Sequence, residues 1–269
     1  MEKTVILICS HNKEVTNYNN KVYFPIHVGA ALSSLRLNMQ RDDEGDNISL
    51  KNKNYCELTG HYWAWKNLPD DVKYIGLVHY RRNFDWCGHQ KDYFVKHVSE
   101  NQNLFEKENV DLNGYDIILP IRSVCPYSIK EQYCMGHVSE DYYIMEAAVK
   151  QKYPEYYDAF QYIMKGNSYS PFNMFFTSRK IFDEYSEWLF PLLLAIEDRV
   201  HVSEYDLQSR VFGFMSERLL NVFCYHKKLK VTYRPIFIAD NNMGENHGVF
   251  YAFCNNVRKN LSYLLGKSK

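Results

Sequence analysis

Short runs of consecutive apolar residues recur along the chain and predict buried β-strands. The clearest are residues 4–9 (TVILIC) and 74–78 (YIGLV). Both are continuous rather than alternating, which is typical of strands buried on both faces of a parallel sheet. Residues 115–120 (YDIILP) and 172–178 (FNMFFTS) have the same character, and 230–240 (KVTYRPIFIAD) predicts a last strand.

Helical periodicity alternates with these runs. In residues 55–68, Tyr55, Leu58, Tyr62 and Trp65 recur at i, i+3, i+7 and i+10 and predict a helix. The further expected segments are a turn and small-residue helix at 23–35, a loop at 41–54, and helices at 139–154, 181–200 and 204–229. Strands that alternate with helices indicate an α/β fold, with a mostly parallel sheet flanked by helices.

Cationic side chains follow two of the predicted strands. His11 and Lys13 follow the first strand, and His79, Arg81 and Arg82 follow residues 74–78. Ligands in such sheets bind beyond the carboxyl ends of the strands, and arginines there are costly to bury without an anion. We therefore expect a diphosphate site, with a structural salt bridge as the alternative. Side chains alternate between faces, so a strand continuing through both arginines would separate them.

An acidic loop, RDDEGDN (41–47), is a second candidate site. Its carboxylates surround Gly45 and could bind a metal ion or, together with Asn47, the hydroxyls of a ribose. The four carboxylates are Asp42, Asp43, Glu44 and Asp46. The spacing is not that of an EF-hand, because the closing Glu is missing. A solvated turn explains the same residues equally well.

Polar residues at helical spacing form a third group. Asp206, Arg210, Gly213 and Glu217 fall at i, i+4, i+7 and i+11, which predicts one polar stripe on a helix. A glycine inside a helix costs about 1 kcal/mol relative to alanine, so we expect something to approach the backbone there. A surface helix with an Asp206–Arg210 pair is the alternative.

Several of these groups are candidates for acid–base chemistry. His137 and Asp141 also lie four residues apart, and a His–Asp pair can act as a general base, although a hydrogen bond at a helix start has the same spacing. The carboxylates that are candidates for a base are Asp206, Glu217 and Asp141. Hydrolase, kinase and dehydrogenase signatures such as G-x-S-x-G, the P-loop and GxGxxG are absent.

Composition narrows the function class. The 269 residues carry 32 Lys and Arg against 32 Asp and Glu, which argues against a dedicated nucleic-acid-binding protein. Seven cysteines without a C-x-x-C pair favour reduced thiols and a cytoplasmic location. The first apolar run is too short for a signal peptide, and no segment reaches the roughly 20 apolar residues of a membrane span.

Five segments together carry a resemblance to a known family. They are GDNISLKNKNYCELTGHYWAWKN, YIGLVHYRRNF, YDIILP, FNMFF and RVFGFMSERLL, within residues 4–235. This combination resembles a family of bacterial glycosyltransferases of capsular and exopolysaccharide synthesis, long described as a domain of unknown function. The resemblance implies a GT-A-like (Rossmann-type) fold for residues 1–240. It also implies sugar transfer from a nucleotide donor, UDP-linked and with galactofuranose as a candidate sugar, to a saccharide or lipid-linked saccharide.

The resemblance also implies roles for the candidate residues. Those expected to bind the donor are His11, Lys13, Asp43, Asp46, Asn47, His79, Arg81 and Arg82, and those expected to bind the acceptor are His137, Asn173 and Arg210. Many GT-A enzymes carry a D-x-D metal-binding motif after a core strand, but this chain has none and places HYRR after Val78. Our hypothesis is that arginine replaces the metal, because a fixed cation stabilises a leaving UDP. No cofactor is then required, although a divalent metal at the acidic loop is an alternative. The other function class is a non-catalytic nucleotide- or carbohydrate-binding subunit of a polysaccharide assembly complex.

Residues 241–269 are expected to form a basic amphipathic tail. Phe253, Val257, Leu261 and Leu264 recur on one face. The basic residues from position 258 onward are Arg258, Lys259, Lys267 and Lys269, with no acidic residue among them. One hypothesis places this helix on the inner face of the plasma membrane as a peripheral contact near a lipid-linked acceptor. The other packs it on the domain with its lysines in water.

Overall fold

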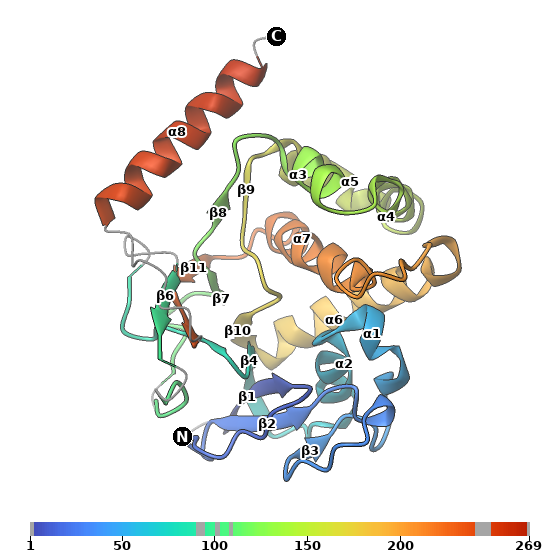
Figure 1. Ribbon diagram of the computed structural model, residues 1–269, viewed down its shortest axis with the longest axis vertical. Helices are drawn as coiled ribbons and strands as arrows, with labels where there is room; N and C mark the ends of the chain where they lie inside the picture. Colours follow the sequence, from blue (N-terminus) through green and yellow to red (C-terminus); the bar gives the residue numbers. More distant parts are fainter. Residues whose placement is uncertain (1–2, 90–94, 100–102, 108–109, 240–248, 268–269) are drawn as a thin grey trace.

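A mixed, mostly parallel sheet forms the centre of the molecule (Figure 1). The computed structural model describes residues 3–89, 95–99, 103–107, 110–239 and 249–267. The strands of the sheet are β1 Lys3–Ser10, β2 Tyr23–His27, β3 Gln40–Arg41, β4 Val72–His79, β5 Arg82–Phe84, β6 Val95–Val98, β7 Ile117–Pro120, β10 Phe175–Ser178, β11 Val231–Arg234 and β12 Ile236–Ala239. A separate pair joins β8 Ser123–Val124 to β9 Ser168–Tyr169.

Strand order places two carboxyl ends side by side. The main path runs β11-β7-β10-β4-β1-β2-β3, and β1 is parallel to both of its neighbours, β2 and β4. Cys9 near the end of β1 pairs with His79 at the end of β4. Strand β10 runs antiparallel to β4 and β7. The predicted α/β class with a mostly parallel sheet is confirmed.

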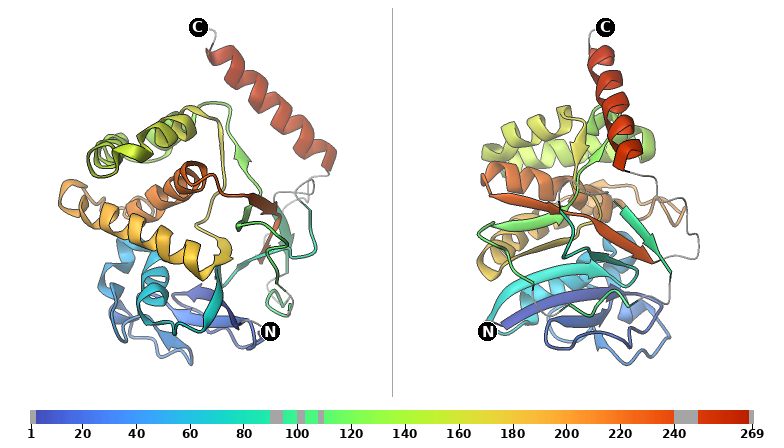
Figure 2. Two further views of the ribbon diagram at one scale, coloured as in Figure 1. Left: turned by 180° about the vertical axis from the view of Figure 1, so that it is seen from behind. Right: turned by 90° about the vertical axis from the view of Figure 1, so that its left-hand side faces the viewer.

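The helices form layers against the sheet. Their bounds are α1 Asn52–Tyr55, α2 Leu58–Asn67, α3 Ile129–Gly136, α4 Ser139–Lys152, α5 Tyr157–Lys165, α6 Arg179–Leu194, α7 Val211–His226 and α8 Val249–Lys267. Short 3-10 turns lie at Ala30–Leu32, Ser49–Lys51, Pro154–Tyr156 and Glu197–Arg199. Helices α2 and α6 lie near the sheet, and α3 to α5 form an outer layer beyond α7 (Figure 2).

Strand β1 explains how the two faces are filled. Val5, Leu7 and Cys9 enter the large core that the helices share, whereas Ile6 and Ile8 enter a second, smaller cluster. Successive side chains of a strand point to opposite faces, so a continuous apolar run serves both cores. The expectation that residues 4–9 are buried on both faces is confirmed.

The segment at 23–35 was expected to be a turn followed by a helix, and this prediction is wrong. Residues Tyr23–His27 form β2, which pairs with β1 in parallel. Pro25 is tolerated because β3 pairs only with Ile26 and His27, so β2 is an edge strand at the proline. Only a 3-10 turn at Ala30–Leu32 follows.

The helix expected at 55–68 is broken at its start. Helix α1 ends at Tyr55 and α2 begins at Leu58, with Cys56 between them at φ 53°. The Asn52 side-chain amide donates to the Cys56 carbonyl at 2.7 Å, which satisfies the backbone at the break. The break leaves Glu57 at the junction of the two helices.

The helix expected at 204–229 begins later than predicted. Helix α7 starts at Val211, and the preceding residues form turns. In this segment Tyr205 is 80% and Leu207 62% exposed, so no apolar side chain anchors a first helical turn to the core.

The C-terminal segment is helical, as expected, over α8. The boundary of the predicted tail at residues 240–248, and Lys269, lie outside the described residues. All seven cysteines are free thiols. Within the described ranges, no helix combines the length and the apolar character that crossing a membrane requires.

Candidate functional site

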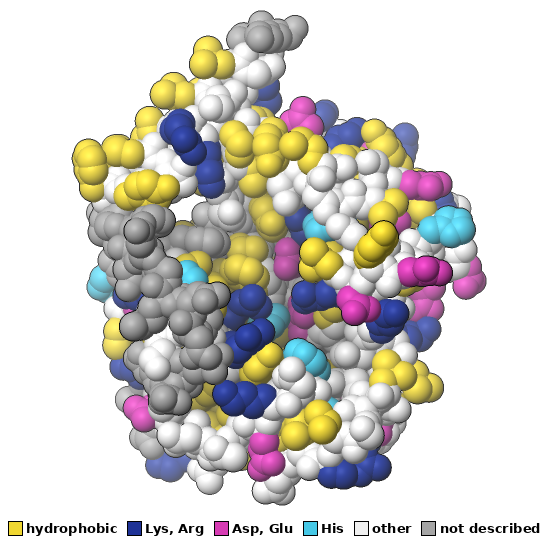
Figure 3. All heavy atoms as spheres, in the orientation of Figure 1, with side chains coloured by type: hydrophobic (Ala, Val, Ile, Leu, Met, Phe, Trp, Pro, Cys, Tyr) yellow, Lys and Arg dark blue, Asp and Glu magenta, His cyan; other side chains and the backbone are white. Residues whose placement is uncertain are grey.

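A cleft of about 480 Å³ lies beyond the carboxyl ends of β1 and β4. Figure 3 shows basic side chains grouped with acidic and histidine side chains near the middle of this face. The lining residues are Cys9, His11, Val28, Asn52, Lys53, Cys56, Glu57, His79, Tyr80, Arg81, Arg82, Asp206, Ser209 and Arg210. The structure therefore brings together most of the cationic groups that follow the two strands.

A tight turn allows both arginines to line the cleft. His79 pairs with Arg82 in an antiparallel β4–β5 connection, so the chain reverses at Tyr80 and Arg81. The Tyr80 N–H donates to the Cys9 carbonyl at 3.1 Å, which attaches the turn to β1. The concern that a continuing strand would separate the arginines does not apply, because the strand ends before them.

The Arg82 guanidinium is partly buried among other charges. It lies 4.8 Å from the centre of the Phe172 ring, and its buried Nε has no hydrogen-bond partner. Burial lowers the pKa of Arg82, and Glu57 opposes this shift while Arg81 and Arg210 reinforce it. A bound anion would stabilise this guanidinium, because it would offset the cost of burying the positive charge.

His11 and Arg210 complete the lining on this side of the cleft. Burial lowers the pKa of His11, and Arg81 and Arg210 lower it further. Arg210 Nε donates to Cys56 Sγ at 3.2 Å. Lys13 follows His11 but is exposed and does not line the cleft; its backbone N–H donates to Ser10 Oγ at 3.3 Å.

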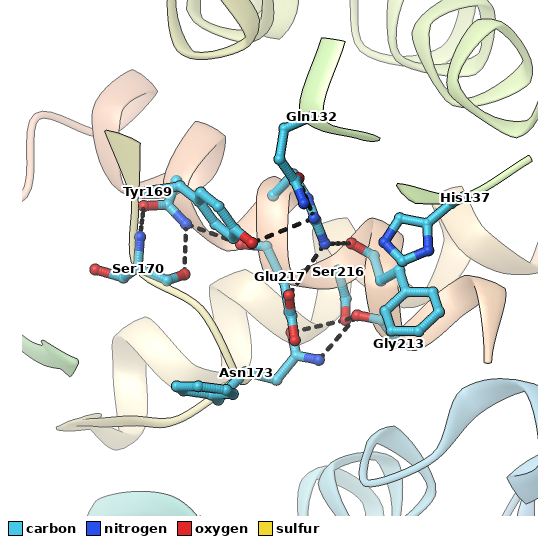
Figure 4. A network of polar contacts seen from close by, with 12 residues as sticks. Gln132, His137, Tyr169, Ser170, Asn173, Gly213, Ser216 and Glu217 are labelled. Carbon is cyan, nitrogen blue, oxygen red and sulfur yellow. Dashed lines mark hydrogen bonds and ion pairs between the residues drawn. The ribbon is translucent and has the colours of Figure 1, made fainter. Parts of the chain in front are cut away.

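The buried carboxylate in the cleft is Glu57, which the sequence analysis did not select. It is 7% exposed, and its Oε1 accepts a hydrogen bond from Asn173 Nδ2 at 2.6 Å. The same amide donates to the Gly213 carbonyl, and Asn173 Oδ1 accepts from Ser216 Oγ at 2.7 Å (Figure 4). Glu57 is part of the CELT segment, but only the fold shows that it reaches the strand ends.

An unusual backbone positions Asn173. Phe172 and Asn173 have φ of 76° and 52°, a conformation that costs about 1–3 kcal/mol in residues other than glycine. His79 Nε2 lies 2.8 Å from the Phe172 carbonyl and must donate, because a carbonyl can only accept. The turn before β10 is thus bonded to the end of β4. Both hydrogens of the Asn173 side-chain amide are donated within the protein, to Glu57 Oε1 and to the Gly213 carbonyl, so neither is available to bind a saccharide acceptor.

Glu217 lies behind the cleft rather than in its lining. Its carboxylate pairs with Arg218 Nη1 at 3.0 Å, and Arg218, which is 1% exposed, also donates to Gln132 at 2.6 Å (Figure 4). Burial raises the pKa of Glu217 and nearby Glu57 raises it further, whereas Arg218 and Arg210 lower it.

The predicted polar stripe is only partly realised. Because α7 begins at Val211, Asp206 does not share a helix face with Glu217, and this prediction is wrong. Asp206 and Arg210 nevertheless line the cleft as exposed residues of the preceding turn. Gly213 permits a close approach, as expected: a Cβ there would stand 3.3 Å from Cys56 Sγ.

The expected His137–Asp141 pair belongs to two different helices. His137 caps the C-terminus of α3, where its ring stacks on Phe214 with centroids 3.9 Å apart. Its Nδ1 lies 3.3 Å from Gln208 Oε1, and burial lowers its pKa to about 4. Asp141 lies in the first turn of α4. Neither residue lines the cleft.

Asp141 should make stability depend on pH. Burial and Glu140 raise its pKa to about 6 from an ordinary 3.8, and His201 opposes the shift. Its contribution therefore favours folding below about pH 4 and is lost as the pH rises through 6. Asp141→Asn is expected to raise the free energy of unfolding by up to about 2 kcal/mol at pH 8, with little change at pH 4.

Urea denaturation at both pH values measures this effect, with the exposed Asp158→Asn as the matched control. A lower stability of Asp141→Asn at pH 8 would contradict the expected ionised, desolvated carboxylate.

The acidic loop does not line the cleft, and its polar groups have hydrogen-bond or ion-pair partners nearby in the fold. Asp43 pairs with Arg41. Asp46 accepts from Tyr62 OH at 3.3 Å, and Asn47 Nδ2 donates to the Gly45 carbonyl at 2.8 Å. The loop begins at the carboxyl end of β3, on the same edge of the sheet, but Asp43, Asp46 and Asn47 do not line the cleft. Among the residues described, no group of three or more His, Cys, Asp or Glu side chains is placed to hold a metal ion.

Comparison with known proteins gives one family and one similar structure. The family described as "Domain of unknown function (DUF4422)" matches residues 5–228. The apo structure of WbbM, a bifunctional glycosyltransferase, is similar with a TM-score of 0.78 and 30% sequence identity. The similarity covers 89% of this chain but 46% of WbbM, so this chain spans about half the length of that protein. No curated protein matches the sequence.

Proposed function

This chain belongs to the DUF4422 family, and we propose that it transfers a sugar from a UDP-linked donor to a saccharide, with the reaction in this cleft. The single observation that carries this proposal is the convergence of three arginines and one buried carboxylate beyond the ends of β1 and β4. Similarity to WbbM over most of this chain supports the reaction class. The capsular or exopolysaccharide product, and galactofuranose as a candidate sugar, follow from the sequence resemblance.

The arginines are proposed to bind the donor diphosphate. The two that bind it are Arg81 and Arg82, from the turn after β4, whereas Arg210, from the segment before α7, lines the same cleft and is assigned to the acceptor. Planar guanidinium groups can each bind two phosphate oxygens, and their charge is permanent. As the bond to the sugar breaks, these fixed cations would stabilise the negative charge that develops on the leaving UDP. His11 and His79 line the same side and are proposed to contact the donor.

Glu57 is proposed to be the general base. An inverting transfer needs a group that takes the proton of the acceptor hydroxyl as the new bond forms. Asn173 orients the Glu57 carboxylate, whereas Asp206 is exposed at the cleft and Glu217 is already paired with Arg218. Arg210 is exposed beside the base and is the residue that we propose contacts the acceptor.

Thermal stabilisation by UDP-sugars tests this proposal. A ligand at about 100-fold its dissociation constant stabilises the folded protein by roughly 2.7 kcal/mol. We expect UDP and at least one UDP-sugar to raise the melting temperature, and ADP-linked sugars to have a smaller effect. Because the arginines replace a metal in this proposal, the shift and the release of UDP should survive EDTA.

Two outcomes would contradict the proposal. If no nucleotide sugar stabilised the protein, the cleft would not be a donor-binding site. If EDTA abolished the shift in melting temperature and a divalent metal restored it, donor binding would require a metal ion. The acidic loop would then be the alternative site for that ion.

A further inference from the structure

Helix α8 turns its polar side toward the rest of the molecule. The residues with intermediate exposure are Ala252, Asn255, Lys259 and Tyr263, which recur at helical spacing. Tyr263 OH donates to the Lys165 carbonyl. Asn260 Oδ1, on the adjoining side of the helix, accepts from Asn167 Nδ2 at 2.8 Å. The helix is therefore attached through polar contacts rather than through an apolar seam, and it projects from the body (Figure 1).

The apolar face of α8 points away from the protein. Six large side chains lie within one arc of about 120° on the helix. They are Phe250, Phe253, Val257, Leu261, Leu264 and Leu265, with exposed fractions between 41% and 79%. Figure 3 shows hydrophobic side chains along the outer edge of the helix. The expected alternative, in which this helix packs its apolar face on the domain, is not what the structure shows. We call these six residues the outer face.

An outward apolar face of this size requires an occupant. A helix of a soluble domain normally buries such a stripe against its core. A contiguous exposed apolar patch marks a site that meets another molecule or a membrane. The remaining question is which occupant the surrounding charges favour.

Charges around the outer face are positive. Residues 249–267 include Arg258, Lys259 and Lys267 and no Asp or Glu, although the whole chain is neutral. One groove between α8 and the body, of about 970 Å³, is lined by Arg122, Lys165 and Lys228 as well and by no acidic residue. A second, of about 400 Å³, has Glu131 and Glu146 beside Lys130 in its lining. A second copy docked by the same face would bring these cations together without any carboxylate on α8 to offset them.

We propose that α8 lies in the headgroup region of an anionic lipid bilayer, with the outer face toward the acyl chains. Amphipathic helices with cationic flanks bind such surfaces through buried apolar area and through attraction to anionic lipids. The basic groove lies behind the helix, between it and the body. This surface is distinct from the cleft at the ends of β1 and β4, so the inference does not depend on the proposed reaction.

Sedimentation of the full chain with vesicles tests the proposal. The vesicles are phosphatidylcholine alone or an equal mixture with phosphatidylglycerol, at low salt. The full chain is expected to bind the anionic vesicles at least tenfold more tightly than the neutral ones, and added salt should weaken this binding. Truncation after Cys254 should abolish it.

A pair of matched double variants separates the apolar face from charge. Leu261→Glu with Leu264→Glu adds two charges to the outer face, whereas Asn256→Glu with Ser262→Glu adds the same two charges elsewhere on the helix. We expect the leucine variant to bind anionic vesicles at least tenfold more weakly than the polar-position variant. An unchanged melting temperature shows that both variants are folded.

Three results would overturn the proposal: no binding by the full chain, equal binding by the two double variants, or a concentration-dependent dimer that only the leucine variant abolishes. The last result would assign the outer face to a second copy of the chain.

Discussion

Glu57→Gln is expected to lower the rate of sugar transfer by about 10² to 10⁴-fold and to leave UDP affinity unchanged. Proton transfer by a positioned side chain contributes an effect of this size. Glutamine keeps the shape of the side chain and an oxygen that can accept from Asn173 Nδ2, which is 2.6 Å from Glu57 Oε1. It cannot take the proton of an acceptor hydroxyl. The measurement is UDP release from the most stabilising UDP-sugar, with and without a saccharide acceptor.

Asp206→Asn is the informative comparison, because Asp206 is the other carboxylate that lines the cleft. The base is Asp206 if its variant loses turnover while Glu57→Gln retains it. Wild-type turnover in both variants would show that neither carboxylate is needed as a base. Evidence for a retaining mechanism would also remove the need for a base of this kind. Loss of UDP binding in Glu57→Gln would instead make Glu57 a structural partner of the arginines.

Arg82→Lys is expected to weaken UDP binding by at least tenfold. Hydrogen bonds to charged groups contribute about 1.5–3 kcal/mol each, and lysine replaces a two-pronged contact by a point charge. Arg82 stands out because its Nε is buried without a partner and because burial lowers its pKa beside Arg81 and Arg210. Arg81→Lys should have an effect in the same direction.

Arg179→Lys is the matched control for these titrations. Arg179 follows β10, which runs antiparallel to β4, so it lies at the opposite edge of the sheet from the cleft. It pairs with Asp183 at 2.9 Å. Equal UDP affinity in Arg82→Lys, Arg81→Lys and the wild type would reject the arginines as the diphosphate site.

The strands that carry the site could be predicted from sequence. Residues 4–9 and 74–78 are continuous apolar runs, a pattern typical of strands that are buried on both faces of a sheet. Once β1 and β4 are parallel neighbours, His11 and the HYRR segment must meet at one edge. Their convergence therefore followed from local pattern and from one rule of topology.

Periodicity misplaced the residues before α7 because tertiary contacts override it. Asp206 and Arg210 fit a helical stripe, but Ser209 Oγ donates to the Asp206 carbonyl and Arg210 Nε donates to Cys56 Sγ. These contacts hold a turn in which both residues still face the cleft. The sequence could identify the residues without identifying the geometry that brings them there.

Glu57 was missed because its surroundings come from distant parts of the chain. Its partner Asn173 lies 116 positions away and depends on a left-handed backbone that no periodic pattern announces. Conversely, the acidic loop attracted attention through composition, yet Asp43 and Asp46 have partners nearby in the fold. Charge clusters in sequence do not reveal whether their charges are already paired.

Hydrogen exchange with and without UDP tests the location of the donor site most directly. The account predicts slower exchange on UDP addition in residues 9–13, 52–57, 79–82 and 206–210, which surround the cleft. Exchange in residues 42–47 and in α8 should not change. Protection confined to 42–47 or to the groove beside α8, with no change at 79–82, would contradict the central claim that the HYRR turn binds the donor diphosphate.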